Sequence, residues 1–195
     1  MGDLKDRELI FVFTGPDGSG RKSVADSVGT TLGLSKVLSY ATRKPRPGEV
    51  NGQDYHFITP ELYDQLAAEG GFIESVTIRE THYGLRDKDI ERNFQNKGCI
   101  YLILNPEGAE KLKQTYGEHV IRLFIYADRN TIETRQLAEG LTEEDVAMRL
   151  SHYEADMAYQ LQCEHAFENY DLSHTVFDIT NTLETYLKRN LEERD

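Results

Sequence analysis

The sequence predicts an α/β fold in which helices cover a parallel β-sheet. Strand-like apolar runs alternate with helical patterns along much of the chain, as in parallel sheets whose connections are helices. The first run, at residues 8–15, ends in a glycine-rich loop, and Val24, Val28 and Leu32 then recur with helical spacing. Between about residues 39 and 85, short strands and a polar loop surround a single helix, which indicates an inserted lobe.

The other elements follow from the same patterns. Further strands are predicted at residues 35–41, 54–58, 71–78, 99–105, 119–127 and 174–180. Helices are predicted at residues 60–70, 87–98 and 106–117. Near the C-terminus, residues 142–166 have the pattern of one long helix, which Thr142 caps and acidic residues follow. Residues 181–193 have the pattern of a final helix.

The composition limits what the protein can do. A chain of 195 residues with 38% hydrophobic content can bury one sizeable core. Its formal net charge of -12 opposes non-specific binding to nucleic acid or to an anionic membrane, so an anionic ligand needs a local cluster of positive charge. Cys99 and Cys163 are too few for a disulfide framework or a metal site, and no apolar run is long enough to span a bilayer or to direct secretion. We expect a soluble cytoplasmic protein with small phosphorylated ligands.

The loop that follows the first strand is close in sequence to a phosphate-binding loop. Its glycines are Gly15, Gly18 and Gly20. They let the backbone turn tightly and aim its N–H groups inward, and the next helix adds its positive N-terminal end. In the pattern G-x-x-x-x-G-K-[ST] a lysine reaches the terminal phosphates. This chain has Arg21 at the lysine position, and its planar guanidinium differs from an ammonium in shape and in reach. Lys22 can substitute if the loop is shifted by one residue, and Ser23 keeps a hydroxyl close by. The alternative is a glycine-rich turn that binds nothing.

A second group of candidate residues lies in the predicted lobe. Arg43 and Arg46 stand out in an acidic chain, and Tyr55 follows them; arginine forks and a tyrosine hydroxyl suit a phosphate dianion. Downstream, Glu74 lies in an apolar run and Tyr83 offers a second phenol. A buried carboxylate accepts hydrogen bonds from the N1–H and amino group of guanine, and so selects guanine over adenine. Taken singly, a basic loop is usually solvated and a lone glutamate usually pairs with a surface lysine, but the combination favours a binding site.

These residues form a pattern that resembles the guanylate kinase family over nearly the whole chain. The family pattern S-x-T-T-R-x-P-R-x-G-E-x-x-G-x-D-Y-x-F appears here as Ser39, Ala41, Thr42, Arg43, Pro45, Arg46, Gly48, Glu49, Gly52, Asp54, Tyr55 and Phe57. The resemblance implies that Arg43, Arg46, Tyr55 and Tyr83 hold the phosphate of GMP. It also implies that Ser39 and Glu74 read the guanine.

The resemblance implies the fold of a P-loop nucleoside monophosphate kinase, in which helices flank a parallel core sheet. A single domain would span residues 1–195, with core segments at 8–38, 86–127 and 150–195. A GMP-binding lobe would lie at about residues 39–85, and a helical lid at about residues 128–149.

On the ATP side the chain departs from the family pattern, beginning with Arg21 at the lysine position. Ile103 and Asn105 replace two carboxylates that would help to organise magnesium. Glu139 replaces a lid arginine that would face the nucleotide phosphates, and Leu85 replaces a small hydroxyl residue that would contact the base.

Other ATP-side residues are retained. The residues expected to bind the ATP phosphates are Gly15, Gly18, Gly20, Arg21, Lys22 and Ser23. The candidate catalytic residues are Arg21, Lys22, Arg135 and Arg149. The cofactors implied are ATP and Mg²⁺, for which Ser23 is the candidate protein ligand. The asparagine expected after the last strand is either Asn181 or replaced by Asp178.

The sequence therefore predicts ATP-dependent phosphoryl transfer to GMP, which gives GDP and ADP and belongs to purine nucleotide metabolism. In this prediction the acceptor site is complete and the donor site is altered. The alternative is a guanylate-kinase-like module without full catalysis, which binds GMP or a phosphorylated peptide, as related domains of membrane-associated scaffold proteins do. Neither reading involves nucleic acid or insertion into a membrane.

Overall fold

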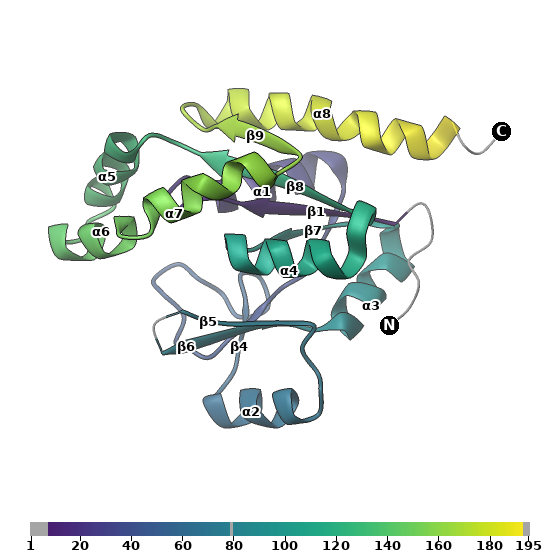
Figure 1. Cartoon of the computed structure of the whole chain (residues 1–195), viewed down its shortest axis with the longest axis horizontal. Coiled ribbons are helices and arrows are strands. Elements are labelled where there is room, and N and C mark those ends of the chain that lie inside the picture. Colours follow the sequence, from purple (N-terminus) through teal and green to yellow (C-terminus); the bar gives the residue numbers. More distant parts are fainter. Residues whose placement is uncertain (1–7, 79, 193–195) are drawn as a thin grey trace.

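The computed structural model describes residues 8–78 and 80–192; residues 1–7, 79 and 193–195 of the predicted domain lie outside the described residues. A five-stranded sheet of order β2-β7-β1-β8-β9 runs through the molecule, and all its neighbouring strands are parallel (Figure 1). Its strands are β1 (Leu9–Thr14), β2 (Ser35–Lys36), β7 (Cys99–Ile103), β8 (Val120–Tyr126) and β9 (His165–Glu168). The prediction of an α/β fold with a parallel sheet is confirmed.

β1 is buried on both faces because helices cover both sides of the sheet. Ile10 and Val12 lie in one core layer, Phe11 and Phe13 lie in the other, and all four are fully buried. The first layer contains residues of α3 (Asp87–Lys97) and α4 (Pro106–Tyr116), and the second contains residues of α1 (Arg21–Leu32) and α8 (Leu172–Glu192). Burial of one such side chain is worth roughly 1.5–3 kcal/mol, so these layers provide much of the stability of the fold.

A second sheet lies apart from the first and is built by residues 40–85 (Figure 1). Its order is β4-β3-β6-β5, with β3 (Tyr40–Ala41), β4 (His56–Phe57), β5 (Glu74–Ile78) and β6 (Thr81–Leu85). α2 (Pro60–Ala68) begins after Thr59, whose hydroxyl accepts a hydrogen bond from the N–H of Leu62. The ring of Tyr63 stacks on Phe72 and His82, with centroids 4.5 and 5.3 Å apart, and so joins α2 to this sheet.

Three short helices follow β8 and form a small cluster of their own. They are α5 (Arg129–Ala138), α6 (Glu143–Leu150) and α7 (Tyr153–Ala158). Asp128 caps α5 and Thr142 caps α6, each through a side-chain oxygen that accepts a backbone N–H. Ile132, Val146 and Leu150 pack together between α5 and α6, so the two helices form one unit.

Two predictions for the last third of the chain are wrong. The predicted helix at residues 142–166 is divided into α6, α7, a 3-10 turn η2 (Tyr159–Gln162) and the start of β9. The predicted strand at residues 174–180 lies within α8, where Thr175, Ile179 and Leu183 recur every four residues and are at most 1% exposed. The helical spacing of these buried residues outweighs the β-propensity of their neighbours.

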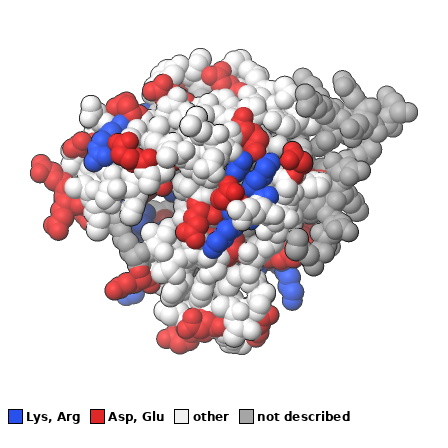
Figure 2. All heavy atoms as spheres, viewed as in Figure 1, with Lys and Arg blue, Asp and Glu red and all other residues white. Residues whose placement is uncertain are grey.

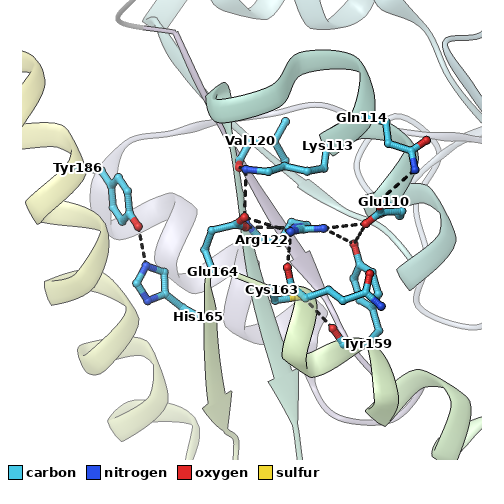
Figure 3. A network of polar contacts seen from close by, with 11 residues as sticks. Glu110, Lys113, Gln114, Val120, Arg122, Tyr159, Cys163, Glu164, His165 and Tyr186 are labelled. Atoms are coloured by element: carbon cyan, nitrogen blue, oxygen red, sulfur yellow. Dashed lines mark hydrogen bonds and ion pairs between the residues drawn. The ribbon is translucent and has the colours of Figure 1, made fainter.

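A buried arginine ties β8 to three neighbouring elements (Figure 3). Arg122 is 7% exposed, and its guanidinium lies 2.8 Å from Glu110 on α4 and 3.1 Å from Glu164, with the Tyr159 hydroxyl at 3.0 Å. Burial opposes the ionisation of Glu164, but hydrogen bonds from Arg122 and Lys113 outweigh it and lower the pKa of Glu164 to about 2. Arg122 therefore fixes α4, η2 and the approach to β9 at the same time. A second 3-10 turn, η1 (Gly117–His119), leads from α4 into β8.

Candidate functional site

The loop between β1 and α1 is closely packed by its neighbours. Gly15, Gly18 and Gly20 have φ angles of 135°, 84° and 83°, which L side chains rarely adopt. A Cβ atom on Gly15 would lie 2.0 Å from the carbonyl oxygen of Ile125, and one on Gly20 would lie 2.4 Å from Nδ2 of Asn169. The loop therefore needs glycine both for its backbone angles and for its contacts with β8 and with the end of β9.

The two basic residues of this loop make different contacts. Nη1 of Arg21 donates a hydrogen bond to the carbonyl of Gly15, so the guanidinium folds back across the loop. Nζ of Lys22 lies 2.8 Å from Oδ1 of Asp54 and 3.5 Å from Oδ2 of Asp26, so it reaches the segment that precedes β4. Ser23 is exposed on the first turn of α1. The structure therefore brings Arg21 to the loop and Lys22 to the second sheet.

The arginines predicted on the lid side lie beside the loop. Nη1 of Arg149 lies 4.0 Å from Oδ2 of Asp17, an acidic loop residue that the sequence analysis did not single out. Nη2 of Arg135 donates to the carbonyl of Asn169 at 2.7 Å. Glu139 is exposed at the C-terminal end of α5. The fold therefore gathers Arg135 and Arg149 near the loop and leaves Glu139 facing solvent.

Asn169, directly after β9, holds the loop and was missed from the sequence. It is 5% exposed, and its Nδ2 donates to the carbonyl of Ser19 at 2.8 Å. Asn181 and Asp178, the two candidates for the asparagine after the last strand, lie within α8 rather than after a strand, so that assignment is wrong. The error followed from placing the last strand at residues 174–180. With the strand at residues 165–168, the sequence itself places Asn169 at its end.

Buried polar atoms without partners surround the same loop. Among the described residues, no hydrogen-bond partner is found for Oγ1 of Thr14, Oγ of Ser19, Oδ1 of Asn169 or either amide atom of Gln136. Gln136 is 1% exposed, and a Cβ on Gly18 would lie 2.3 Å from its Nε2. An unsatisfied buried polar group costs about 1–3 kcal/mol, so a ligand or ordered water that bonded to these atoms would stabilise the loop.

Basic and aromatic side chains of the second sheet form a second group. Nη1 and Nη2 of Arg43 donate to the carboxylate of Glu49 at 2.6 and 2.8 Å, and Nε donates to the hydroxyl of Tyr83 at 3.1 Å. The guanidinium carbon lies 5.2 Å from the ring centroid of Tyr55. Arg46 is exposed, and its backbone N–H donates to Glu49 at 2.7 Å. The structure thus brings Arg43, Tyr55 and Tyr83 together and places Arg46 at the rim.

The residues predicted to read a base are buried in the lobe. Glu74, at the start of β5, is 3% exposed, and its Oε1 has no hydrogen-bond partner within the described part of the chain. Burial raises the pKa of Glu74 to about 7, against the smaller opposing effect of Lys111. Ser39 is 9% exposed and comes just before β3. Leu85 is fully buried and packs in the core beside β1 and α3.

The residues present do not fit the magnesium site that the family pattern implies. Oδ1 of Asn105 accepts the N–H of Gly108 at 2.9 Å and caps α4, and Ile103 is apolar. Across residues 8–78 and 80–192, no three His, Cys, Asp or Glu side chains are grouped as metal ligands. Ser23 offers a single exposed hydroxyl, one residue after Lys22. The donor atoms that Mg²⁺ prefers are therefore not gathered at this loop.

Acidic side chains outnumber basic ones in this chain, which gives the net charge of -12. Figure 2 shows them at the left end, where α6 begins with Glu143, Glu144 and Asp145, and at the bottom, where α2 lies. Basic side chains occur in small groups between them, and some lie in a hollow between the short helices that follow β8 and the second sheet. None of the described helices has the length and apolar character of a membrane span.

One family model and several known proteins that are similar to this chain carry the description guanylate kinase. The family model described as guanylate kinase matches residues 7–186. The guanylate kinase of Shewanella frigidimarina is 30% identical over 181 residues, which cover 91% of this chain and 87% of that protein. The guanylate kinase of Fusobacterium nucleatum is 25% identical over 180 residues, covering 92% and 97%. The crystal structure of guanylate kinase from Anaplasma phagocytophilum matches with a TM-score of 0.68 at 26% identity, covering 91% of this chain and 85% of that chain.

Proposed function

Because the chain belongs to the guanylate kinase family, we propose that it transfers the γ-phosphoryl group of ATP to GMP and so forms ADP and GDP. The main structural support for this proposal is the ion pair between Lys22 and Asp54. It joins the glycine-rich loop to the segment that contains Tyr55, so the two groups of candidate residues lie close together. Burial raises the pKa of Tyr55, and the nearby positive charge of Arg21 opposes this rise, which supports a common space between loop and lobe. Relatives named guanylate kinase match most of the chain, so the non-catalytic module is not favoured.

On the acceptor side, the lobe binds GMP through its phosphate and its base. The phosphate dianion receives hydrogen bonds from Arg43, Arg46, Tyr55 and Tyr83. Glu74, in its ionised form, accepts hydrogen bonds from the N1–H and amino group of guanine, and Ser39, just before β3, is the second residue that reads the base. The buried positions of Glu74 and Ser39 exclude water from these hydrogen bonds and strengthen them.

On the donor side, the loop binds ATP through its backbone N–H groups and the N-terminal end of α1. Phosphoryl transfer spreads negative charge over the oxygens of the moving group, so catalysis depends on positioning and on nearby cations. Arg21, Arg135 and Arg149 are the guanidinium groups that the fold gathers near the loop. They supply the positive charge that the transition state needs.

An assay of GDP formation from GMP and ATP, compared with GMP binding alone, tests this proposal. We expect the intact chain to form GDP in proportion to enzyme and time, and to bind GMP in preference to AMP. Binding of GMP without any formation of GDP would contradict the kinase assignment. Equal binding of AMP and GMP would contradict the role of Glu74.

The affinity for GMP is expected to increase by about tenfold between about pH 6 and about pH 8. Burial raises the pKa of Glu74 to about 7, so the carboxylate that accepts guanine's hydrogens forms in this window. In the absence of GMP, the same ionisation of Glu74 has the opposite effect on the stability of the fold, which decreases with pH. The folded state holds this proton more tightly than the unfolded chain, so stability falls as the pH rises from 4.5 to about 7. Calorimetric titration of GMP across this pH range measures the effect.

The variant Glu74→Gln tests whether Glu74 causes this pH dependence, because glutamine keeps the side-chain volume but cannot ionise. It is expected to bind GMP weakly and to lose the pH dependence that Glu74 contributes. The second ionisation of the GMP phosphate is common to both proteins, so their comparison isolates the carboxyl group. A variant with the same rise in affinity as the parent would show that Glu74 does not read the base.

Arg21→Lys is expected to increase the rate of phosphoryl transfer, by about tenfold, and to leave GMP affinity nearly unchanged. The guanidinium of Arg21 is bound to the Gly15 carbonyl, whereas a lysine ammonium at this position reaches the terminal phosphates as a compact charge. The value of kcat and the GMP dissociation constant, measured side by side, check this prediction. A parent with ordinary turnover that does not respond to Arg21→Lys would contradict it.

A further inference from the structure

The phosphate-binding loop carries a lysine at the position that usually binds magnesium. In the pattern G-x-x-x-x-G-K-[ST], counted from Gly15 to Gly20, Arg21 takes the lysine position and Lys22 takes the Ser or Thr position. The three glycines with positive φ angles and the start of α1 at Arg21 place the loop in this register without any inserted residue. The ammonium of Lys22 therefore lies at the position where the usual loop has a neutral Ser or Thr hydroxyl that binds Mg²⁺.

The ammonium of Lys22 has defined partners. It lies 2.8 Å from Asp54 and 3.5 Å from Asp26, and the hydrogen bond to Asp54 raises the pKa of Lys22 although burial opposes it. Asp26 is also bound by Nζ of Lys36 at 2.7 Å and by the hydroxyl of Tyr101 at 3.0 Å. Asp54 and Asp26 are thus engaged with protein donors, the loop residue Asp17 lies 4.0 Å from Nη1 of Arg149, and Lys22 stays positively charged at neutral pH.

A divalent ion at this position would meet an unfavourable environment. The ammonium of Lys22 repels a second cation at contact distance, and the repulsion is larger in a partly desolvated site than in water. Asp54 would have to leave Lys22 before it could serve as a ligand. At the end of β7, Asn105 is occupied in capping α4 and Ile103 has no ligand atom. The site therefore already contains one positive charge of its own and offers few oxygens to a metal.

We propose that Lys22 replaces the magnesium ion at the donor phosphates, so that this chain binds ATP without a divalent cation. The inference rests on the proposed function, since it concerns the ATP side of the same site. In the free protein Lys22 is held by Asp54 and Asp26; with ATP bound, its ammonium contacts the β- and γ-phosphate oxygens that Mg²⁺ bridges in enzymes with the usual loop. Arg21, whose guanidinium is bound to the Gly15 carbonyl in the free protein, adds a second positive charge at the same loop.

Calorimetric titration of ATP into the full chain, once in excess EDTA and once in excess MgCl₂, tests this inference. The parent is expected to bind ATP in EDTA with a dissociation constant within about threefold of its value in MgCl₂. Lys22→Ser restores the usual pattern, so its affinity in EDTA is expected to fall by about tenfold or more, and MgCl₂ is expected to recover most of that loss. Lys22→Arg keeps the charge and is expected to remain independent of Mg²⁺.

The control is Lys88→Ser, which removes the same charge from an exposed position on α3 and is expected to change neither titration. Near-UV circular dichroism shows whether each variant keeps the fold. If the parent binds ATP only with Mg²⁺, or if Lys22→Ser binds ATP in EDTA as the parent does, the inference is wrong while the proposed function stands. If ATP binds under neither condition, ATP is not the donor, and both statements fall.

Discussion

Arg43→Ala is expected to weaken GMP binding by about 2–5 kcal/mol, which corresponds to a loss of roughly 30-fold to several thousand-fold. The guanidinium side chain is 15% exposed, and Glu49 and the Tyr83 hydroxyl already hold it in place, so little side-chain freedom is lost when the phosphate binds. The alanine variant also leaves the Glu49 carboxylate without its cation, close to the GMP phosphate. Both effects lower the affinity, and calorimetric titration of GMP measures their sum.

Two further variants separate these contributions. Arg43→Lys keeps the charge without the fork, so it is expected to recover part of the affinity. In the double variant Arg43→Ala, Glu49→Gln the repulsion from Glu49 is absent, so GMP should bind more tightly than it does to Arg43→Ala alone. GMP affinity equal to that of the parent in Arg43→Ala would mean that the phosphate lies elsewhere.

Arg122→Met is expected to lower the free energy of unfolding by about 2–4 kcal/mol at neutral pH. The substitution keeps most of the buried volume but leaves Glu164 and Glu110 without the guanidinium that contacts them at 3.1 and 2.8 Å. These carboxylates are 24% and 36% exposed, which places the expected cost below that of a fully buried pair. Urea unfolding followed by circular dichroism measures it.

The pH dependence of this loss gives a second check. The folded state lowers the pKa of Glu164 to about 2, below its ordinary value of 4.5, so the ionised pair stabilises the fold above about pH 4.5. That contribution disappears as the pH falls through about 2, and the difference between parent and Arg122→Met should shrink with it. Lys113→Met is the matched control, because Glu164 then keeps Arg122 and the loss should be smaller. Equal losses from the two variants would contradict the central role of Arg122.

The parallel sheet could be predicted because its strands are short apolar runs between helical patterns, and β1 shows why. Four consecutive residues, 10–13, are buried alternately in two core layers, which requires helices on both faces. The last strand could not be predicted in the same way. β9 lies at the edge of the sheet and has only four residues of mixed polarity, whereas residues 174–180 contain more β-branched and aromatic residues. Only the four-residue spacing of Thr175, Ile179 and Leu183 distinguishes that segment as a helix.

The candidate site was predictable where a residue's role follows from its own chemistry. Arg43, Tyr55 and Tyr83 carry hydrogen-bond donors in a recognisable pattern, and the structure brings them together. Residues that act through packing gave no such signal. Gln136 lies on α5, and its approach to Gly18 depends on how α5 packs against the loop. The pairing of Lys22 with Asp54 likewise depends on the distance between two sheets, which no local pattern records.

The hydrogen bond from Asn169 to the carbonyl of Ser19 joins residues that are 150 positions apart in the chain. When a ribosome has made the first half of this protein, every residue of the glycine-rich loop exists, but the amide that holds its backbone does not. The loop can take its final shape only after β9 has been synthesised and has paired with β8. Long-range contacts of this kind form late because closing the intervening chain costs entropy. A nascent chain should therefore gain nucleotide affinity near the end of its folding, and that affinity reports completion of the sheet.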